Sequence, residues 1–170
     1  MATSSSRPSD APSVTIRPAT RADLPAVGRL GALLVRMHHD FDPLRFLPAT
    51  PHTEQGYASF LGTQLDVRDV IVLVAEGSGE LLGYTYAGLE GIDYMSLRGP
   101  AGVLYDIVVD PAHRGRGIGR TLLDATMAAL RERGAPRVLL STAQQNVPAQ
   151  RLFEGAGFRR TMIEMTRELD

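Results

Sequence analysis

One stretch, residues 103–123, constrains what this chain can fold into more than any other. It reads VLYDIVVDPAHRGRGIGRTLL. An apolar run ends at Asp110-Pro111, a cluster of glycines and arginines follows, and an amphipathic helical pattern then begins. This order predicts a strand, a glycine-rich turn and a helix start, which together present backbone N–H groups and a positive helix end to an anion.

Two familiar phosphate-binding loops do not fit this turn. The dinucleotide fingerprint G-x-G-x-x-G accepts Gly115 and Gly117, but its third glycine position holds Arg120. A P-loop needs a lysine, and all 18 basic residues of the chain are arginines. What remains is the pattern Arg114-x-x-Gly117-x-Gly119, whose glycines allow backbone amides to turn inward and a pyrophosphate to approach closely. A solvated glycine-rich turn with a basic rim explains the same residues equally well.

Composition narrows the class of protein. A chain of 170 residues makes one domain with a proper core. The net charge of -1 argues against a nucleic-acid partner, and the lack of cysteine excludes a disulfide framework and a cysteine nucleophile. Residues 1–13 are rich in Ser, Pro and Ala, and we expect a disordered tail ahead of a single domain at 14–170. The chain lacks a secretory signal pattern and an apolar run long enough for a membrane, so the expected location is the cytoplasm.

Hydrophobic periodicity predicts alternating strands and helices in an α+β chain. Thr20 to Asp23 resembles a capping box at the start of the first helix. The expected order is β-α-α-β-β-β-α-β-α-β, with strands at 14–17, 70–76, 81–89, 103–109, 137–141 and from 158 through 165, and helices at 24–39, 51–65, 118–134 and 146–155.

A second motif, from Asn146 to Phe158, gives the glycine cluster a context. Together the two segments resemble the GCN5-related N-acetyltransferase (GNAT) family, which shows R/Q-x-x-G-x-G/A after its fourth strand and N-x-x-A-x-x-L-Y-x-x-x-G-F after its fifth. The matching residues are Arg114, Gly117, Gly119, Asn146, Ala149, Leu152, Gly157 and Phe158. The resemblance covers residues 14–169, is specific from Leu104 onward, and implies an acyl-CoA N-acyltransferase fold with a central mixed sheet flanked by helices.

The resemblance implies that acetyl-CoA is the cosubstrate, with no metal. In this family acetyl-CoA lies where the fourth and fifth strands splay apart. Carried onto this chain, the backbones of Ile107, Val108 and Val109 hold the pantetheine arm, Asn146 touches it from the far wall, and Phe153 is a further cofactor-binding candidate. The resemblance implies that the turn itself binds the pyrophosphate; its residues are Arg114, Gly115, Arg116, Gly117, Ile118, Gly119 and Arg120.

The chemistry that the resemblance implies is direct attack of a primary amine on the thioester. Asp106 and Tyr105 are the candidates for handling the amine proton. Asp106 interrupts an apolar strand, where an unpaired carboxylate is costly to bury, so it either serves the reaction or pairs with a neighbouring loop. Strand alternation places Tyr105 on the opposite face, so at most one of the two faces the acceptor. Phe153 stands where the family usually has a tyrosine acid, which predicts slow turnover or a substitute donor such as Tyr105 or a water.

The acceptor amine, a small molecule or a peptide or protein amine, is not readable from the sequence. His38, His39, Asp40 and Asp42 sit where this fold closes the acceptor pocket, as the residues of a pocket or of a solvated loop, and Tyr84, Tyr86 and Tyr94 are further lining candidates. Two alternatives stay open: a non-catalytic or very weakly active acyl-CoA-binding or sensing domain, which Phe153 favours, and a homo-oligomeric interaction module. A homodimer is compatible with each reading, and we expect neither a nucleic acid nor a membrane as partner.

Overall fold

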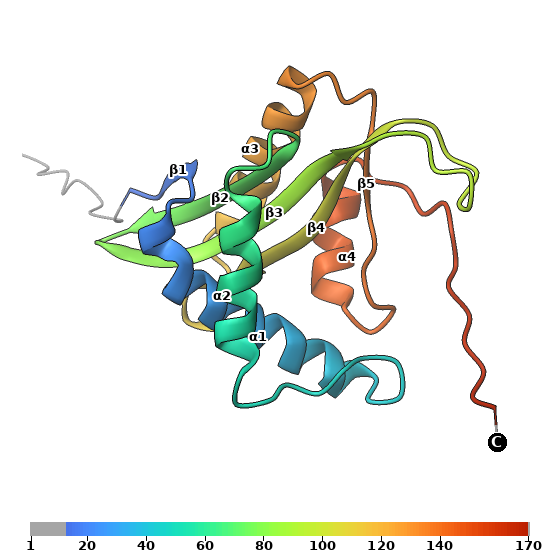
Figure 1. Ribbon diagram of the computed structural model, residues 1–170, viewed down its shortest axis with the longest axis horizontal. Coiled ribbons are helices and arrows are strands. Elements are labelled where there is room, and N and C mark those ends of the chain that lie inside the picture. The colour runs from blue at the N-terminus through green and yellow to red at the C-terminus, as the bar shows by residue number, and fades with distance from the viewer. Residues whose placement is uncertain (1–12, 170) are drawn as a thin grey trace, which may run out of the picture.

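The protein is built on one five-stranded mixed sheet. The computed structural model describes residues 13–169. The strands follow one another across the sheet in the order β1-β2-β3-β4-β5 (Figure 1). The first four pair antiparallel, and β5 joins β4 in parallel. The strand bounds are β1 Thr15–Pro18, β2 Val70–Gly77, β3 Glu80–Glu90, β4 Ala101–Val109 and β5 Val138–Leu140.

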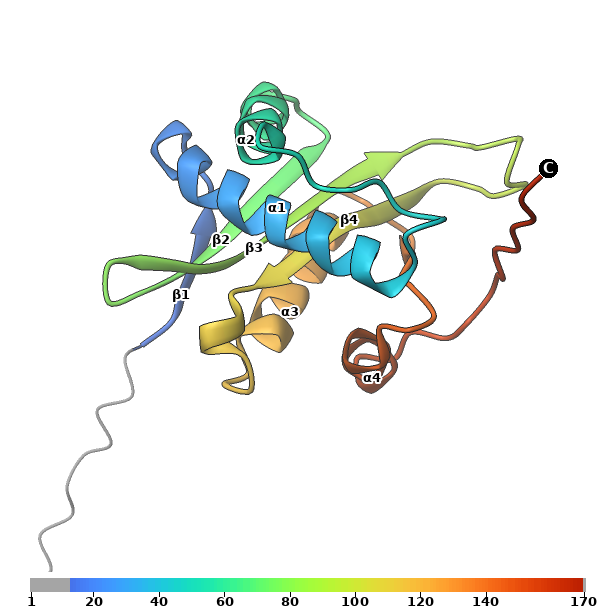
Figure 2. The same ribbon diagram turned by 90° about the horizontal axis from the view of Figure 1, so that it is seen from below.

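Helices cover both faces of this sheet. Figure 2 shows α1 and α2 on one side of it and α3 and α4 on the other. The helix bounds are α1 Leu24–Phe41, α2 Thr53–Gln64, α3 Ile118–Glu132 and α4 Val147–Gly155, with short 3-10 turns at Arg21–Asp23 and Pro111–His113. The predicted α+β class with a mixed sheet between helices is therefore confirmed. Within residues 13–169, no helix combines the length and the apolar character that crossing a membrane requires.

The capping box that the sequence predicts forms at the 3-10 turn directly ahead of α1. The Thr20 amide donates to the Asp23 carboxylate across 2.7 Å, and Asp23 also accepts two hydrogen bonds from the guanidinium of Arg17. These contacts tie the end of β1 to the helix.

The core has two halves, one on each face of the sheet. Leu104, Leu122 and Leu130 belong to the half under α3, while Val27, Leu61 and the fully buried Tyr84 belong to the half under α1 and α2. Strand β4 contributes to both halves because successive side chains of a strand point to opposite faces.

A β-bulge in β4 changes this alternation at one point. Tyr86 of β3 pairs with Asp106, but the next residue, Ala87, pairs with Leu104, so Tyr105 is an extra residue. Leu104 consequently packs on the α3 side, whereas Asp106 bonds to Tyr84 on the α1 side. Tyr105 stacks on Tyr86 with 4.7 Å between the ring centroids. The prediction that Tyr105 and Asp106 lie on opposite faces is therefore wrong, since a bulge breaks the two-residue period.

Two expectations concern the ends of the chain. The predicted last strand, from 158 through 165, is wrong: residues 158–169 carry no regular structure, and Met162, Ile163 and Met165 are largely exposed. A strand needs a neighbour for its backbone hydrogen bonds, and β5, at the edge of the sheet, has only three residues. The expected disordered tail falls on residues 1–12, outside the described part of the chain, and on Ser13.

Candidate functional site: a groove between two parting strands

Strands β4 and β5 part soon after they meet. Their pairing covers only Gly102 to Leu104 against Val138 to Leu140. Among residues 13–169, no strand lies on the β5 side of β4 from Tyr105 to Val109, so this edge can hydrogen-bond an extended ligand as if the ligand were a strand.

A small cavity of about 70 Å³ opens where the strands separate. Five of the predicted site residues line it together: Tyr105, Asp106, Ile107, Asn146 and Phe153. The same cavity is lined by residues that the sequence did not single out, among them Leu34, Met37, Ser141 and Thr142. The side chain of Val108, by contrast, is buried in the core half under α1 and α2, so only its backbone can reach the groove.

The glycine-rich turn lies between the end of β4 and the start of α3. Gly115 and Gly117 have φ angles of 75° and 79°, in the left-handed region that favours glycine. A Cβ added at either residue would meet nothing within 4 Å, so the space in front of them is open. Gly117 caps α3, whose first amides have no carbonyl partner within the helix. Open space and unpaired amides fit the pyrophosphate expected here.

The arginines of the turn differ in what they contact. Arg114 donates from Nε to the carbonyl of Val109 across 3.1 Å, at the end of β4. Arg120 binds Asp124 at 2.9 Å and the Gly155 carbonyl at 3.0 Å, so its side chain joins α3 to the end of α4. Arg116 is exposed. The backbone of the turn and the side chains of Arg114 and Arg116 are therefore better placed than the Arg120 side chain to meet an anion.

Asp106 is a carboxylate held among phenols. Its Oδ2 accepts a hydrogen bond of 3.0 Å from Tyr84. Burial raises the pKa of Asp106, and the hydroxyls of Tyr84 and Tyr57 and the charge of His38 offset only part of that rise. Burial and the neighbouring carboxylate also raise the pKa of both phenols. A carboxyl group with a raised pKa beside a cavity is typical of a functional site.

Tyr105 has its hydroxyl engaged elsewhere. It donates to the carboxylate of Glu90 across 2.6 Å, and Glu90 also binds Arg98. Burial, followed by the contact with Glu90, raises the pKa of Tyr105. This phenol therefore holds its proton tightly and is a weak candidate for the acid that Phe153 does not supply.

Asn146 and Phe153 both have structural contacts. Asn146 is the N-cap of α4, and its side-chain oxygen accepts a hydrogen bond of 3.3 Å from the backbone amide of Ala149. The side-chain NH2 group of Asn146 is not used in this bond and can donate to another partner. Phe153 is only 5% exposed and packs edge-to-face against Phe158 with 5.9 Å between the ring centroids. The interpretation of Phe153 as a core aromatic agrees with this packing.

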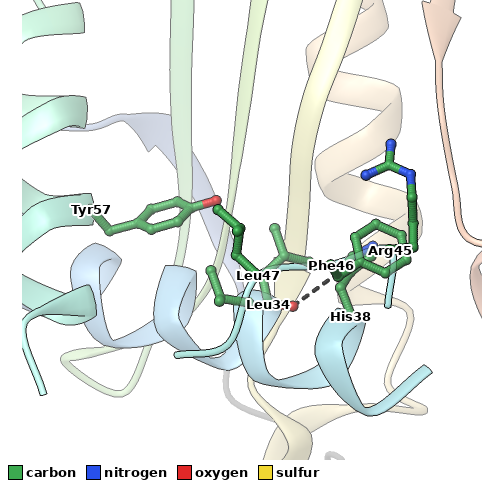
Figure 3. A pocket seen from close by; sticks show the side chains of 7 residues that line it. Leu34, His38, Arg45, Phe46, Leu47 and Tyr57 are labelled. Carbon is green, nitrogen blue, oxygen red and sulfur yellow. Dashed lines mark hydrogen bonds between the residues drawn. The ribbon is translucent and has the colours of Figure 1, made fainter. Parts of the chain in front are cut away.

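A second cavity, of about 290 Å³, adjoins the first. Figure 3 shows its lining residues, which come from α1, α2 and the loop between these helices: Leu34, Val35, His38, Arg45, Phe46, Leu47 and Tyr57. Leu34 and His38 line both cavities. The two cavities therefore adjoin at Leu34 and His38.

The other residues expected at the acceptor pocket mostly support the loop. His39 donates from Nδ1 to the Phe46 carbonyl at 2.9 Å, and Asp42 accepts hydrogen bonds from two amides of the loop. Asp40 and the largely exposed Tyr94 line neither cavity. Tyr57, which does line the larger cavity, belongs to a helix with a weak apolar pattern, and no signal in the sequence distinguishes it from a core residue.

Comparison with known proteins agrees with this geometry. The family model described as "Acetyltransferase (GNAT) family" matches residues 34–158, which is most of the chain. The chain belongs to the GNAT family of acetyltransferases. Among solved structures, a mutant of the BH1408 protein from Bacillus halodurans has a TM-score of 0.77 at 22% identity and covers 91% of this chain and 99% of its own. The aminoglycoside N-acetyltransferase AAC(6')-Iy in complex with CoA has a TM-score of 0.71 at 18% identity, covering 96% and 99%.

Curated relatives share the sequence over a shorter range. A mycothiol acetyltransferase of Thermobispora bispora is 40% identical over 96 residues, which is 54% of this chain and 31% of the relative. A mycothiol acetyltransferase of Thermobifida fusca is 33% identical over 115 residues, or 63% and 36%. The chain thus spans about a third of the length of these relatives.

Proposed function

We propose that this protein transfers the acetyl group of acetyl-CoA to a primary amine. The observation that carries the proposal is the parting of β4 and β5 after Leu104, beside a helix start whose glycines leave backbone amides open. An amide-bearing arm fits the strand edge, and a pyrophosphate fits the helix start. The name of the curated relatives, mycothiol acetyltransferase, supports an acetyl transfer.

The reaction needs no covalent intermediate on the protein. An ammonium acceptor first gives up a proton to solvent, and the neutral amine nitrogen then attacks the thioester carbonyl. A C–N bond forms, the C–S bond breaks, the CoA thiolate leaves and the nitrogen releases a second proton. A thiol pKa of about 8.5 makes the thiolate a tolerable leaving group near neutral pH, so an acid at the position of Phe153 is dispensable. A backbone N–H near Ile107 or Val108 is the proposed donor to the developing oxyanion. Asp106, the carboxylate in the cavity, would attract the ammonium form of the acceptor.

A thiol-release assay tests the proposal. The protein is incubated with acetyl-CoA and a panel of amines, and free CoA and acetylated amine are measured together. Stoichiometric formation of both supports the transferase. CoA binding with no acetylated product from any amine would favour the alternative, a binding or sensing domain, whereas a failure to bind CoA would overturn both.

A further inference from the structure

The cavity of about 290 Å³ carries information on the acceptor. Its walls are apolar or aromatic at Leu34, Val35, Phe46, Leu47 and Tyr57. The two remaining lining residues are His38 and Arg45, and no carboxylate is among the described residues that line it. The wall therefore favours an apolar group, and its described lining residues offer no carboxylate to a second positive charge.

The adjoining groove supplies the complementary negative charge. Asp106 is the acidic residue among those that line the smaller cavity, which shares Leu34 and His38 with the larger one. One carboxylate suits one ammonium group. Arg45 of the larger cavity pairs with Glu164 of the C-terminal segment, so its charge is already matched by a carboxylate.

We infer that the acceptor is an amine with a single positive charge attached to an apolar body, rather than a polyamine or an aminoglycoside. The apolar body occupies the larger cavity and the amine reaches past His38 to Asp106. This inference rests on the proposed function for the identity of the site, but it concerns binding and can be tested without turnover.

Binding of phenethylamine and spermidine to the CoA-saturated protein tests this inference. We expect phenethylamine to bind at least about tenfold more tightly, the gain from burying one aromatic group. Exposed Leu47 lines the cavity, and exposed Leu44 of the same loop does not. Leu47→Glu should weaken phenethylamine and strengthen spermidine, and Leu44→Glu should change neither. Tighter binding of spermidine to the unmodified protein, or equal effects of the two substitutions, would overturn the inference. Binding of phenethylamine without acetyl transfer would instead count against the proposed function alone.

A separate observation concerns His38. Its Nδ1 lies 2.9 Å from the carbonyl oxygen of Leu34, as the dashed line in Figure 3 marks. A carbonyl can only accept, so Nδ1 carries a proton and, in the neutral ring, Nε2 carries the lone pair. The rings of Phe41 and Phe46 pack edge-on against the imidazole at 6.0 and 4.9 Å between centroids, which holds its orientation.

We propose that Nε2 of His38 accepts the proton that the amine loses as its C–N bond forms. His38 lines both cavities, the larger one proposed for the acceptor and the smaller one that also contains Asp106. Histidine is suited to this step because its charge changes within the physiological pH range. The ionisable groups that share its surroundings are Asp106 and Tyr105 from β4, Tyr57 from α2, Tyr84 from β3 and Arg45 from the loop.

Two measurements test this role, one of them independent of turnover. Nitrogen-15 NMR of the imidazole should show the Nδ1–H tautomer for His38, and an Nε2–H tautomer would overturn the proposal. In the acetyl-transfer assay, His38→Gln should lower kcat by about 10²- to 10⁴-fold, while KM for acetyl-CoA stays unchanged. The control His52→Gln alters an exposed histidine outside both cavities and should leave the rate intact. An unchanged kcat in His38→Gln would refute the assignment.

Discussion

The hydroxyl of Tyr84 donates a 3.0 Å hydrogen bond to the carboxylate of Asp106, joining neighbouring strands on the face that α1 and α2 cover. Tyr84 is fully buried, and Asp106 is the acidic residue at the bottom of the groove between β4 and β5. The protein thus keeps a carboxylate where burial raises its pKa. Groups that are retained at a cost in stability are characteristic of functional sites.

We expect Asp106→Asn to change the free energy of unfolding more favourably at pH 7 than at pH 4. The folded pKa of Asp106 lies above the unfolded value of about 3.9. The contribution of Asp106 to the free energy of unfolding therefore falls as the pH rises from its unfolded pKa toward its folded pKa. Asparagine does not ionise, so the variant does not lose this stability. Urea unfolding at both pH values measures the difference. Asp40→Asn, which removes an exposed carboxylate of α1, is the control for net charge. The free energy of unfolding of the variant is compared with that of the unmodified protein at each pH. A difference that is less favourable to the variant at pH 7 than at pH 4 would contradict the expectation.

Asp23→Asn is expected to show the opposite dependence. Hydrogen bonds from Arg17 lower the pKa of Asp23, so its contribution is present above the unfolded value of about 3.9 and is lost as pH falls toward the folded value. Because Arg17 is partly exposed, we expect a cost of about 1–3 kcal/mol at pH 7. The surface pair Arg21–Asp66 provides the control: Asp66→Asn should cost about 0–1 kcal/mol. Equal costs for the two variants in urea unfolding would show that the pairing at β1 does not stabilise the fold.

Gly117→Ala should weaken CoA binding, and Gly134→Ala should not. Both glycines have left-handed φ angles, 79° and 87°, and both face open space. An alanine at either position costs about 1–2 kcal/mol of stability for the same backbone reason. Only Gly117 begins the helix whose amides would hold the pyrophosphate, since Gly134 follows the other end of α3. Calorimetric titration with CoA separates the two effects, and equal CoA affinities for both variants would remove the turn from the binding site.

Gly31→Ala should destabilise the protein and disturb the larger cavity. A Cβ at Gly31 would come within 2.2 Å of the Tyr57 ring, which lines that cavity. The displacement should cost about 1–3 kcal/mol, the usual range for overpacking. Gly56→Ala in α2 is the matched substitution, because a Cβ there meets nothing within 4 Å. It should stabilise the helix by about 0.5–1 kcal/mol. Thermal unfolding of both variants reports the sign, and a stabilised Gly31→Ala would mean that α1 and α2 do not pack as closely as described.

Local patterns were sufficient for most elements of this fold. The capping box at Thr20 and Asp23, the hairpin from β2 to β3 and the glycine start of α3 depend on residues close in sequence, so their chemistry is readable there. The last strand failed for the converse reason. The apolar residues of this segment fit a strand, but residues 158–169 do not pair with any strand of the described sheet.

The sequence by itself determined the family motifs, the order of elements up to α4 and the residues available for the groove. Only the tertiary structure decided which side chains meet there. The bulge at Tyr105 places Asp106 with Tyr84 under α1, and the packing of α1 on α2 brings His38 and Tyr57 to the same space. A bulge depends on how two strands register, and a cavity depends on elements far apart in the chain. The glycine-rich stretch therefore identifies the proposed acetyl-CoA site from local sequence, while the proposed acceptor site exists only in the folded protein.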